Sequence, residues 1–339
     1  MVKMERGRLW AFVAVCALAA AAIGTSIARA RLSRSSIHTA TTTSAAAPVL
    51  STPPVRPFVM FRSLRPDETW SHIALAPLAS PDGARHVTSL VCERVYFAGT
   101  RGVCLVAEKT LIPTFSAYVF DEQFKPLRKI ALTGPPSRTR LSPDGRRAAV
   151  TVFEQGHSYA EHGFSTRTTL IDTMTGTSLG DLEQFAVTRD GARFRAPDFN
   201  FWGVSFAQDG NRFYATLSTA NVPYLIEGHV DSREAHIVSA GIECPSLSPD
   251  NARIAFKKRV QRSSGLGWEI WLLDLTTLTR TPVAGEARSI DDQVDWLDDT
   301  HLVYHYPSTD GTNIWQTETD GPSASQRYIS NAYSPAVVR

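Results

Sequence analysis

The feature that most constrains this chain is a short phrase that recurs along it. The phrase reads LSPDGRRAAV at 141–150, FAQDGNRFYA at 206–215 and LSPDNARIAF at 247–256. In each copy an Asp-Gly or Asp-Asn pair precedes a run that is rich in β-forming residues. Because Asp, Asn and Gly tolerate the positive φ angles of tight turns, the phrase predicts a turn that leads into a strand. A chain that repeats this turn is built from repeated β units.

The sequence after residue 57 indicates an all-β fold. Short runs rich in Val, Ile, Tyr, Phe, Trp and Thr alternate with turn signals, and no long amphipathic helix is evident. A second phrase follows the copies of the first, as in TTLIDTMTG at 168–176 and IWLLDLTT at 270–277. It describes an apolar strand that ends in Asp and a turn. The repeat unit is therefore a four-stranded antiparallel meander.

The spacing of the turns predicts how many units the chain has. The turn markers are Gly99, Asp144, Asp209, Asp250, Asp298 and Pro335. Their intervals of 45, 65, 41, 48 and 37 residues, with four strands in each unit, are typical of β-propeller blades. Six markers predict six blades. The long interval from Asp144 to Asp209 is expected to carry extra loop.

The last marker leaves too little chain for a blade of its own. We therefore expect the C-terminal strand to be the innermost strand of a closing blade, which pairs with N-terminal strands and removes an exposed sheet edge. The other three strands are expected at 58–64, 72–78 and 85–90. The segment ASPDGA at 79–84 is then the turn between the two outer strands of that blade.

The N-terminal residues differ from the rest of the chain. Basic residues precede an almost continuous apolar run from Leu9 to Ala28, and Ala28–Ala30 offers a small-x-small cleavage site. Residues 1–30 are predicted to be either a cleaved signal peptide or a membrane anchor, and both alternatives place the rest outside the cytoplasm. Residues 31–56, rich in Ser, Thr, Ala and Pro, are predicted to be a disordered linker. The propeller is expected to occupy 57–339.

The phrases LSPDGRRAAVTV, LSPDNARIAF and EIWLLDLTT resemble the repeats of TolB-like six-bladed propellers, which also occur in prolyl-oligopeptidase-type enzymes. The resemblance covers most of 57–339. Two departures matter: TolB has an α/β domain before its propeller, where this chain has the linker, and the chain has no length for the hydrolase domain of those enzymes. A propeller that has neither of these domains is similar to stand-alone TolB-like proteins of bacterial envelopes. For these the resemblance implies binding or scaffolding without catalysis.

The blade topology predicts which segments surround a ligand. The loop between strands two and three opens on the same face as the connections between blades. The loop at 154–166 is of the first type, and SIDDQV at 289–294 and DFNFWG at 198–203 are of the second. All three should rim one mouth of the central channel, where ligands and partners usually dock. The binding candidates on them are His157, Tyr159, His162, Trp202, Asp292 and Gln293. The structural alternative is that Trp202 packs between blades and that Asp292 caps a turn.

No catalytic, metal or cofactor site is predicted. His157, Glu161 and His162 lack the spacing of helical metal ligands, and the five Asp of DDQVDWLDD at 291–299 cannot all converge, because alternate strand residues point to opposite faces. Cys92 and Cys104 flank one hairpin and are candidates for a disulfide. Cys244 is expected to be buried and inert.

The sequence favours a non-enzymatic, extracytoplasmic propeller that binds a protein or cell-envelope partner through the loop-rich mouth. Alternatives are a propeller hydrolase or lyase and a small-ligand sensor, each with its site at the channel mouth. The formal net charge of +2 and the absence of a basic stripe argue against nucleic acid. Membrane contact is expected only through the N-terminal segment, and the propeller is expected to be monomeric.

Overall fold

The computed structural model describes residues 50–108, 111–159, 161, 163–263 and 265–339. The predicted signal peptide or anchor and the first part of the predicted linker lie outside these ranges. Among the residues described, no helix is long and apolar enough to cross a membrane. Residues 50–56 form no regular element, yet they contact the propeller: the Leu50 N–H donates to the Arg85 carbonyl (2.8 Å).

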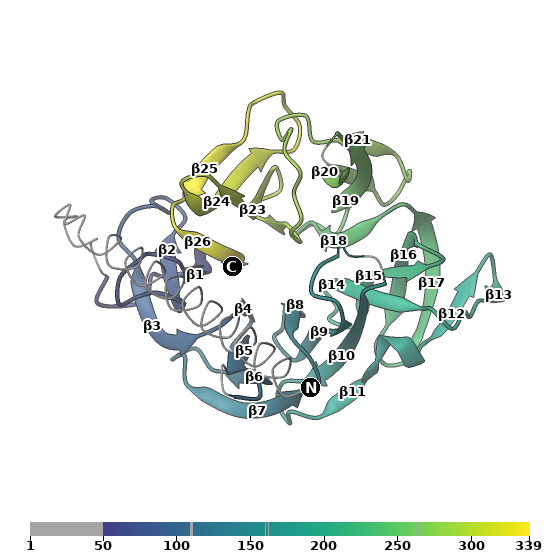
Figure 1. Cartoon of the computed structure of the whole chain (residues 1–339), viewed down its shortest axis with the longest axis horizontal. Coiled ribbons are helices and arrows are strands. Elements are labelled where there is room, and N and C mark those ends of the chain that lie inside the picture. The colour runs from purple at the N-terminus through teal and green to yellow at the C-terminus, as the bar shows by residue number, and fades with distance from the viewer. Residues whose placement is uncertain (1–49, 109–110, 160, 162, 264) are drawn as a thin grey trace, which may run out of the picture. The chain divides into compact units, whose positions relative to one another are not determined.

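The described strands form six sheets around a central axis, which confirms the predicted six-bladed propeller (Figure 1). Blade 1 contains β4 (Arg94–Ala98), β5 (Arg101–Glu108), β6 (Thr114–Phe120) and β7 (Pro126–Leu132). Blade 2 contains β8 (Pro136–Leu141), β9 (Arg147–Gln155), β10 (Ser165–Asp172) and β11 (Ser178–Asp181). Blade 3 contains β14 (Asn200–Phe206), β15 (Arg212–Thr219), β16 (Val222–His229) and β17 (Glu234–Ala240). Blade 4 contains β18 (Glu243–Leu247), β19 (Arg253–Arg262), β20 (Gly265–Asp274) and β21 (Arg280–Pro282). Blade 5 contains β22 (Asp295–Trp296), β23 (His301–Ser308), β24 (Gly311–Glu318) and β25 (Gln326–Ile329).

The closing blade joins the two ends of the propeller, as predicted. Its strand order is β26 (Ala332–Val338), β1 (Phe58–Ser63), β2 (His72–Pro77) and β3 (His86–Val91). β26 pairs antiparallel with β1, with Val337 opposite Val59. One detail of the prediction is wrong. Pro335 is not in a turn after the inner strand but lies inside β26, next to a bulge at Ser334 (φ 54°).

The long interval between the second and third markers contains more than the predicted loop. It holds the 3-10 helix η1 (Leu182–Gln184) and the strands β12 (Ala186–Arg189) and β13 (Ala192–Arg193). β12 pairs in parallel with β17, the outer strand of blade 3, and β13 pairs with β12. The inserted residues thus widen blade 3 to six strands. The sequence did not reveal this because β12 and β13 are short and lack a clear alternation.

The recurring phrase forms the turn between the first two strands of a blade. In blade 2 the Ser142 hydroxyl donates to the Asp144 carboxylate (2.5 Å), which also accepts the Arg146 N–H (3.0 Å). Blade 4 repeats this arrangement at Ser248 and Asp250. Gly145 has φ 73°, and a Cβ there would lie 2.4 Å from the Ala98 carbonyl of blade 1. The turn therefore needs glycine both for its conformation and for close packing between blades.

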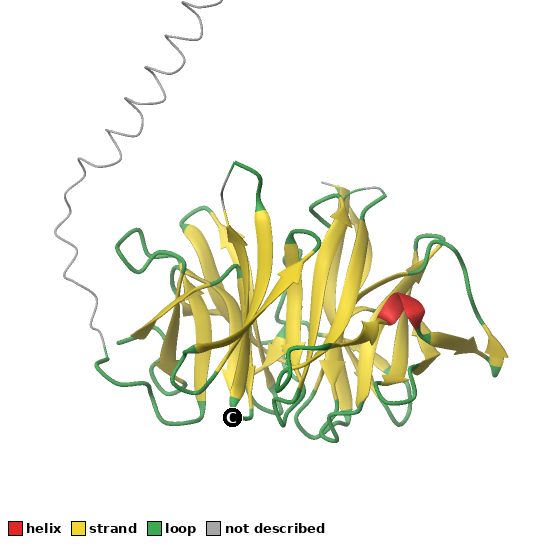
Figure 2. Cartoon of the chain, turned by 90° about the horizontal axis from the view of Figure 1, so that it is seen from below, coloured by secondary structure: helices red, strands yellow, loops and turns green. Residues whose placement is uncertain are grey.

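The two ends of the blades form two faces (Figure 2). We call loop face the one that carries the hairpins between strands two and three and the connections between blades. The opposite face carries the turns between strands one and two and the end of β26, and we call it the turn face. Apolar side chains fill the space between blades: Val103 and Leu105 of β5, for example, share one buried cluster with Val150 of β9.

Candidate binding site at the loop face

The inner strands supply the side chains of the central channel. Because alternate strand residues point to the same side, Arg94 and Tyr96 of β4 form one pair of channel residues, and Arg138 and Arg140 of β8 form another. These residues line three successive hollows. A mouth of about 380 Å³ opens at the loop face, a constriction of about 20 Å³ follows, and a cavity of about 240 Å³ lies toward the turn face.

The mouth is bounded by four of the six blades. Blades 1 and 2 contribute most of it, and the connection before β22, β23 and β26 complete it. Its lining residues are Glu93, Arg94, Ala107, Phe115, Pro135, Pro136, Ser137, Arg138, Phe153, His157, Ser158, Tyr159, Asp291, His305 and Tyr333. The mouth thus combines aromatic walls with charged groups of both signs, which is a composition suited to binding.

A buried carboxylate holds the charged groups together below the mouth. The Asp292 Oδ2 lies 2.5 Å from the His305 Nδ1, and its Oδ1 lies 3.4 Å from the Arg94 Nη1 and 4.0 Å from the Arg138 Nη2. Asp292 is only 2% exposed. The ring of His305 in turn packs on Tyr333, with 4.0 Å between their centroids, and Arg94 stacks over the same tyrosine.

The electrostatics of this cluster follow from burial and from the two guanidinium groups. Burial lowers the pKa of His305 because it disfavours the imidazolium, although Asp292 opposes this shift. Burial by itself would raise the pKa of Asp292, but the neighbouring His305, Arg94 and Arg138 hold it well below its usual value. The cluster at neutral pH therefore contains an ionised Asp292, two arginines and a neutral His305.

A second group of interactions fixes the hairpin that overhangs the mouth. The Tyr159 hydroxyl lies 2.5 Å from the Ser137 Oγ, and its ring is stacked under Arg138. Burial raises the pKa of Tyr159 to about 12. Lys257, almost fully buried, donates to Asp291 Oδ1 at 2.5 Å and lies over the rings of Tyr159 and Trp268. The carboxylate of Asp291 raises the pKa of Lys257 despite its burial, so that the lysine stays charged.

The predicted binding residues divide into three groups. His157 is exposed on the hairpin and lines the mouth together with Tyr159, which is itself buried. Trp202 and Gln293 do not reach the mouth. Trp202 is fully buried between blades in a cluster with Phe153 and Tyr159, and the Gln293 amide donates to the carbonyls of Val204 and Pro245. Trp202 thus packs between blades, which is the structural alternative given for it, and neither side chain lines the mouth.

The third group consists of the remaining two predicted residues, Asp292 and His162. Asp292 does not cap a turn but organises the charged cluster below the mouth. His162 lies outside the described residues.

The sequence prediction missed four channel residues, namely Arg94, Arg138, Arg140 and His305. Arg94, Arg138 and Arg140 each precede a turn marker, on the strand predicted to be innermost. Successive strand residues point to opposite sides, so counting back from each marker in steps of two residues indicates which side chains face the channel axis. His305 gave no such signal, because it belongs to a second strand and reaches the channel only beside the bulged β26.

The aspartates of 291–299 have separate partners, although only Asp295 of them lies in a strand. Asp291 binds Lys257, Asp292 binds His305, and Asp298 accepts the Thr300 and His301 N–H groups in a turn. No group of three or more His, Cys, Asp or Glu side chains that could hold a metal is present among the residues described.

The cysteines of the propeller fall into a pair and a single residue. Cys92 and Cys104 form a disulfide with an S–S distance of 2.07 Å, which ties the segment before β4 to β5. This bond anchors the chain next to Glu93 and Arg94, two residues of the mouth. Cys244 is a buried thiol whose pKa is raised by burial, so it has little thiolate character.

Comparison with known proteins supports the fold and leaves the function open. No protein-family model matches the sequence, and no curated protein is similar enough in sequence to be matched. The structure is similar to TolB from Acinetobacter baumannii, with a TM-score of 0.56 and 15% sequence identity. The match covers 83% of this chain and 66% of that TolB chain, which is just under two thirds of its length.

A second solved structure of similar fold belongs to a nidogen/laminin complex. It matches 83% of this chain and 97% of the other chain, with a TM-score of 0.54 and 11% identity. At these identities the similarity shows the propeller fold alone. The sequence-based resemblance to TolB-like propellers is thus confirmed for the architecture.

Proposed function

We propose that this chain is a non-enzymatic, extracytoplasmic propeller that binds a protein or cell-envelope partner at the loop-face mouth. The observation that carries the proposal is the mouth itself, where exposed His157 stands beside a concave surface lined by aromatic rings and by Arg94, Arg138 and Asp291. Buried ion pairs hold these groups in place before any partner arrives, which lowers the cost of binding. The propeller of similar fold from the nidogen/laminin complex belongs to a protein assembly, which is consistent with this role.

The proposal includes location and anchorage. The apolar run before Ala30 delivers the propeller outside the cytoplasm, either as an anchor or as a cleaved signal. The disulfide of Cys92 and Cys104 is suited to that oxidising environment. The propeller acts as a monomer, with its loop face available to the partner.

A photo-crosslinking residue at position 157 tests the proposal in intact cells that express the protein with its native N-terminus. Position 157 is better than the buried Tyr159, and Met174 on the turn face of the same blade serves as the matched control site. We expect one discrete protein adduct from position 157 and none from 174. The adduct should disappear in Ala107→Trp, which fills the mouth with an indole. Equal adducts from both sites, or an adduct that survives Ala107→Trp, would contradict the proposed surface.

One observation favours an enzymatic alternative. The His305 imidazole lies at the mouth and contacts the buried Asp292 carboxylate, an arrangement that orients histidine as a general base in hydrolases. Its test is turnover of an ester or lactone panel by the purified chain, with His305→Gln as the comparison. Activity that His305→Gln abolishes, without loss of folding, would establish the alternative in place of the binding role.

A further inference from the structure

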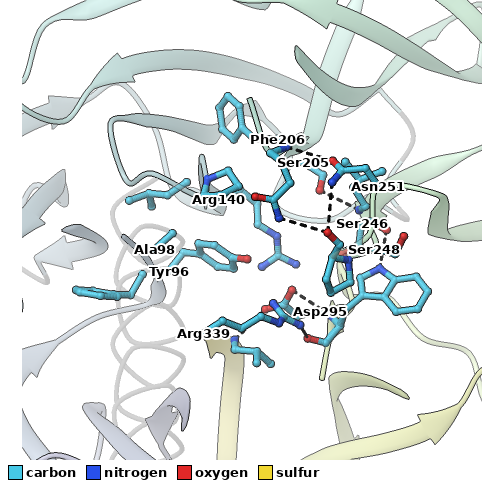
Figure 3. A pocket seen from close by; sticks show the side chains of 18 of the residues that line it. Tyr96, Ala98, Arg140, Ser205, Phe206, Ser246, Ser248, Asn251, Asp295 and Arg339 are labelled. Atoms are coloured by element: carbon cyan, nitrogen blue, oxygen red, sulfur yellow. Dashed lines mark hydrogen bonds between the residues drawn. The ribbon is translucent and has the colours of Figure 1, made fainter. Parts of the chain in front are cut away.

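The cavity at the turn-face end of the channel has a composition different from that of the mouth (Figure 3). All six blades contribute to it. Its polar and aromatic lining comprises Tyr96, Phe97, Arg140, Ser205, Phe206, Gln208, Ser246, Ser248, Asn251, Asp295, Trp296 and Arg339. The cavity has a volume of about 240 Å³, which suits a small molecule.

The central group of this cavity is the Arg140 guanidinium, which points into it beside Tyr96 (Figure 3). Arg140 is only 7% exposed. Its Nη2 donates to the carbonyls of Val294 (2.8 Å) and Gln293 (3.4 Å), and its guanidinium stacks over the Tyr96 ring. Within the part of the chain that the structure describes, no carboxylate lies within the 4.0 Å of an ion pair with Arg140.

The carboxylate in the same cavity is already engaged. Asp295 accepts the Val337 N–H at 2.9 Å and the Trp296 N–H at 3.1 Å, one on each oxygen. Burial, together with the neighbouring Asp295, raises the pKa of Tyr96 to about 12, so the phenol stays protonated. The second arginine of the lining, Arg339, is exposed, so Arg140 is the buried cation of this cavity, and among the residues described it has no ion-pair partner. A buried charge that lacks an ionic partner is costly, and it is relieved when an anion binds.

We propose that this cavity binds a small monoanionic, hydroxylated carboxylate of about sugar-acid size. The ligand's carboxylate pairs with Arg140, whose planar fork matches a carboxylate better than a point charge does. A single negative charge balances the one buried guanidinium of Arg140, whereas a doubly charged phosphate exceeds it. The Ser246 hydroxyl also lines the cavity, and the Ser205 hydroxyl and the amides of Asn251 and Gln208, although each makes one or two hydrogen bonds to the backbone, keep further donors or acceptors for the ligand's hydroxyl groups.

The site is separate from the proposed partner surface. The constriction lined by Arg138, Asp292 and Gln293 lies between the cavity and the mouth. The inference therefore does not rest on the proposed function. Failure of one experiment leaves the other intact.

Isothermal titration calorimetry of the purified full chain tests the site, with D-gluconate as the probe and neutral D-glucose and inorganic phosphate as comparisons. We expect saturable gluconate binding, at least tenfold weaker in Arg140→Gln. The matched control is Arg280→Gln, because Arg280 also donates to a backbone carbonyl and stacks on an aromatic ring but lies on the outer strand β21. This control should bind gluconate like the unmodified chain.

A second variant distinguishes a loss of binding from a loss of folding in Arg140→Gln. Ala98→Leu keeps the arginine and places a larger side chain in the lining, and it should weaken gluconate binding to a similar degree. Absence of saturable gluconate binding, equal affinity in Arg140→Gln, or glucose binding as tight as gluconate would overturn the proposal. Phosphate binding tighter than gluconate would overturn the assignment of a carboxylate.

Discussion

The mouth on the loop face and the cavity on the turn face are built by the same inner strands, but their buried cations differ in whether they have a carboxylate partner. At the mouth each buried cation lies near a carboxylate: Arg94 and Arg138 near Asp292, and Lys257 near Asp291. In the cavity Arg140 has two carbonyls and an aromatic ring but, among the residues described, no carboxylate partner. A charge that is balanced within the protein fixes a rigid surface, whereas an unbalanced one favours binding of an external anion.

The largest effect is expected from the aromatic support of the mouth. Trp202→Ala should lower the free energy of unfolding by about 4 kcal/mol, because it leaves a large void between three blades. Denaturant unfolding followed by circular dichroism measures this loss. Trp70→Ala, at a tryptophan that is 54% exposed, is the control and should change stability by no more than about 0.5 kcal/mol. Similar losses of unfolding free energy in both variants would show that Trp202 stabilises the propeller no more than an exposed tryptophan does.

Removal of the central carboxylate should come next. Asp292→Asn keeps the shape of the side chain but leaves Arg94 and Arg138 without their buried counter-charge, so stability should fall by about 3 kcal/mol. The exposed pair of Asp310 and Arg327 provides the control, since Asp310→Asn should cost much less stability than Asp292→Asn. A small loss in Asp292→Asn would mean that the charges of the mouth are not balanced as the geometry indicates.

The corresponding change in the cavity should be milder. Arg140→Gln should lower stability by only about 1 kcal/mol, because it removes two hydrogen bonds to carbonyls but also an unpaired buried charge. The same unfolding experiment compares it directly with Asp292→Asn. If Arg140→Gln costs as much as Asp292→Asn, the contrast between the two ends of the channel fails.

The smallest expected effect concerns pH. The folded-state pKa of His305 lies below its unfolded value near 6.5, so the unfolded chain takes up a proton first as the pH falls. Stability should therefore fall as the pH is lowered from about 7.5 to about 5.5, because the unfolded chain gains protonated histidine first. Asp292, whose pKa is lowered, adds nothing in that window, because it is ionised in both states. Urea midpoints across the window should depend less on pH in His305→Gln than in the unmodified chain. An unchanged slope would show that folding does not lower the pKa of His305.

Much of the fold could be predicted because its determinants are local. Asp144 and Gly145 form the predicted turn by their own backbone preferences, and the period of such turns gave the number of blades and the closing strand. The additional strands of blade 3 could not be predicted in the same way. β12 exists as a strand because β17 offers a free edge, which is a tertiary condition.

The candidate site was only partly predictable for a related reason. The order of strands and loops placed His157, Tyr159 and the segment of Asp292 at one end of the channel. Whether a side chain reaches the channel depends on how tightly the blades pack, which left Trp202 and Gln293 buried beneath the surface.

By itself the sequence determined the repeat, the turns, the number of blades and the face on which the long hairpins lie, because each follows from local backbone preference and chain order. The tertiary structure alone decided which charges meet. Asp292 and His305 form a cluster with Arg94 and Arg138, while Arg140, two residues along the same strand as Arg138, has no such partner among the residues described. Contacts between distant segments depend on distances of a few ångströms, and those are set only when all six blades close into one ring.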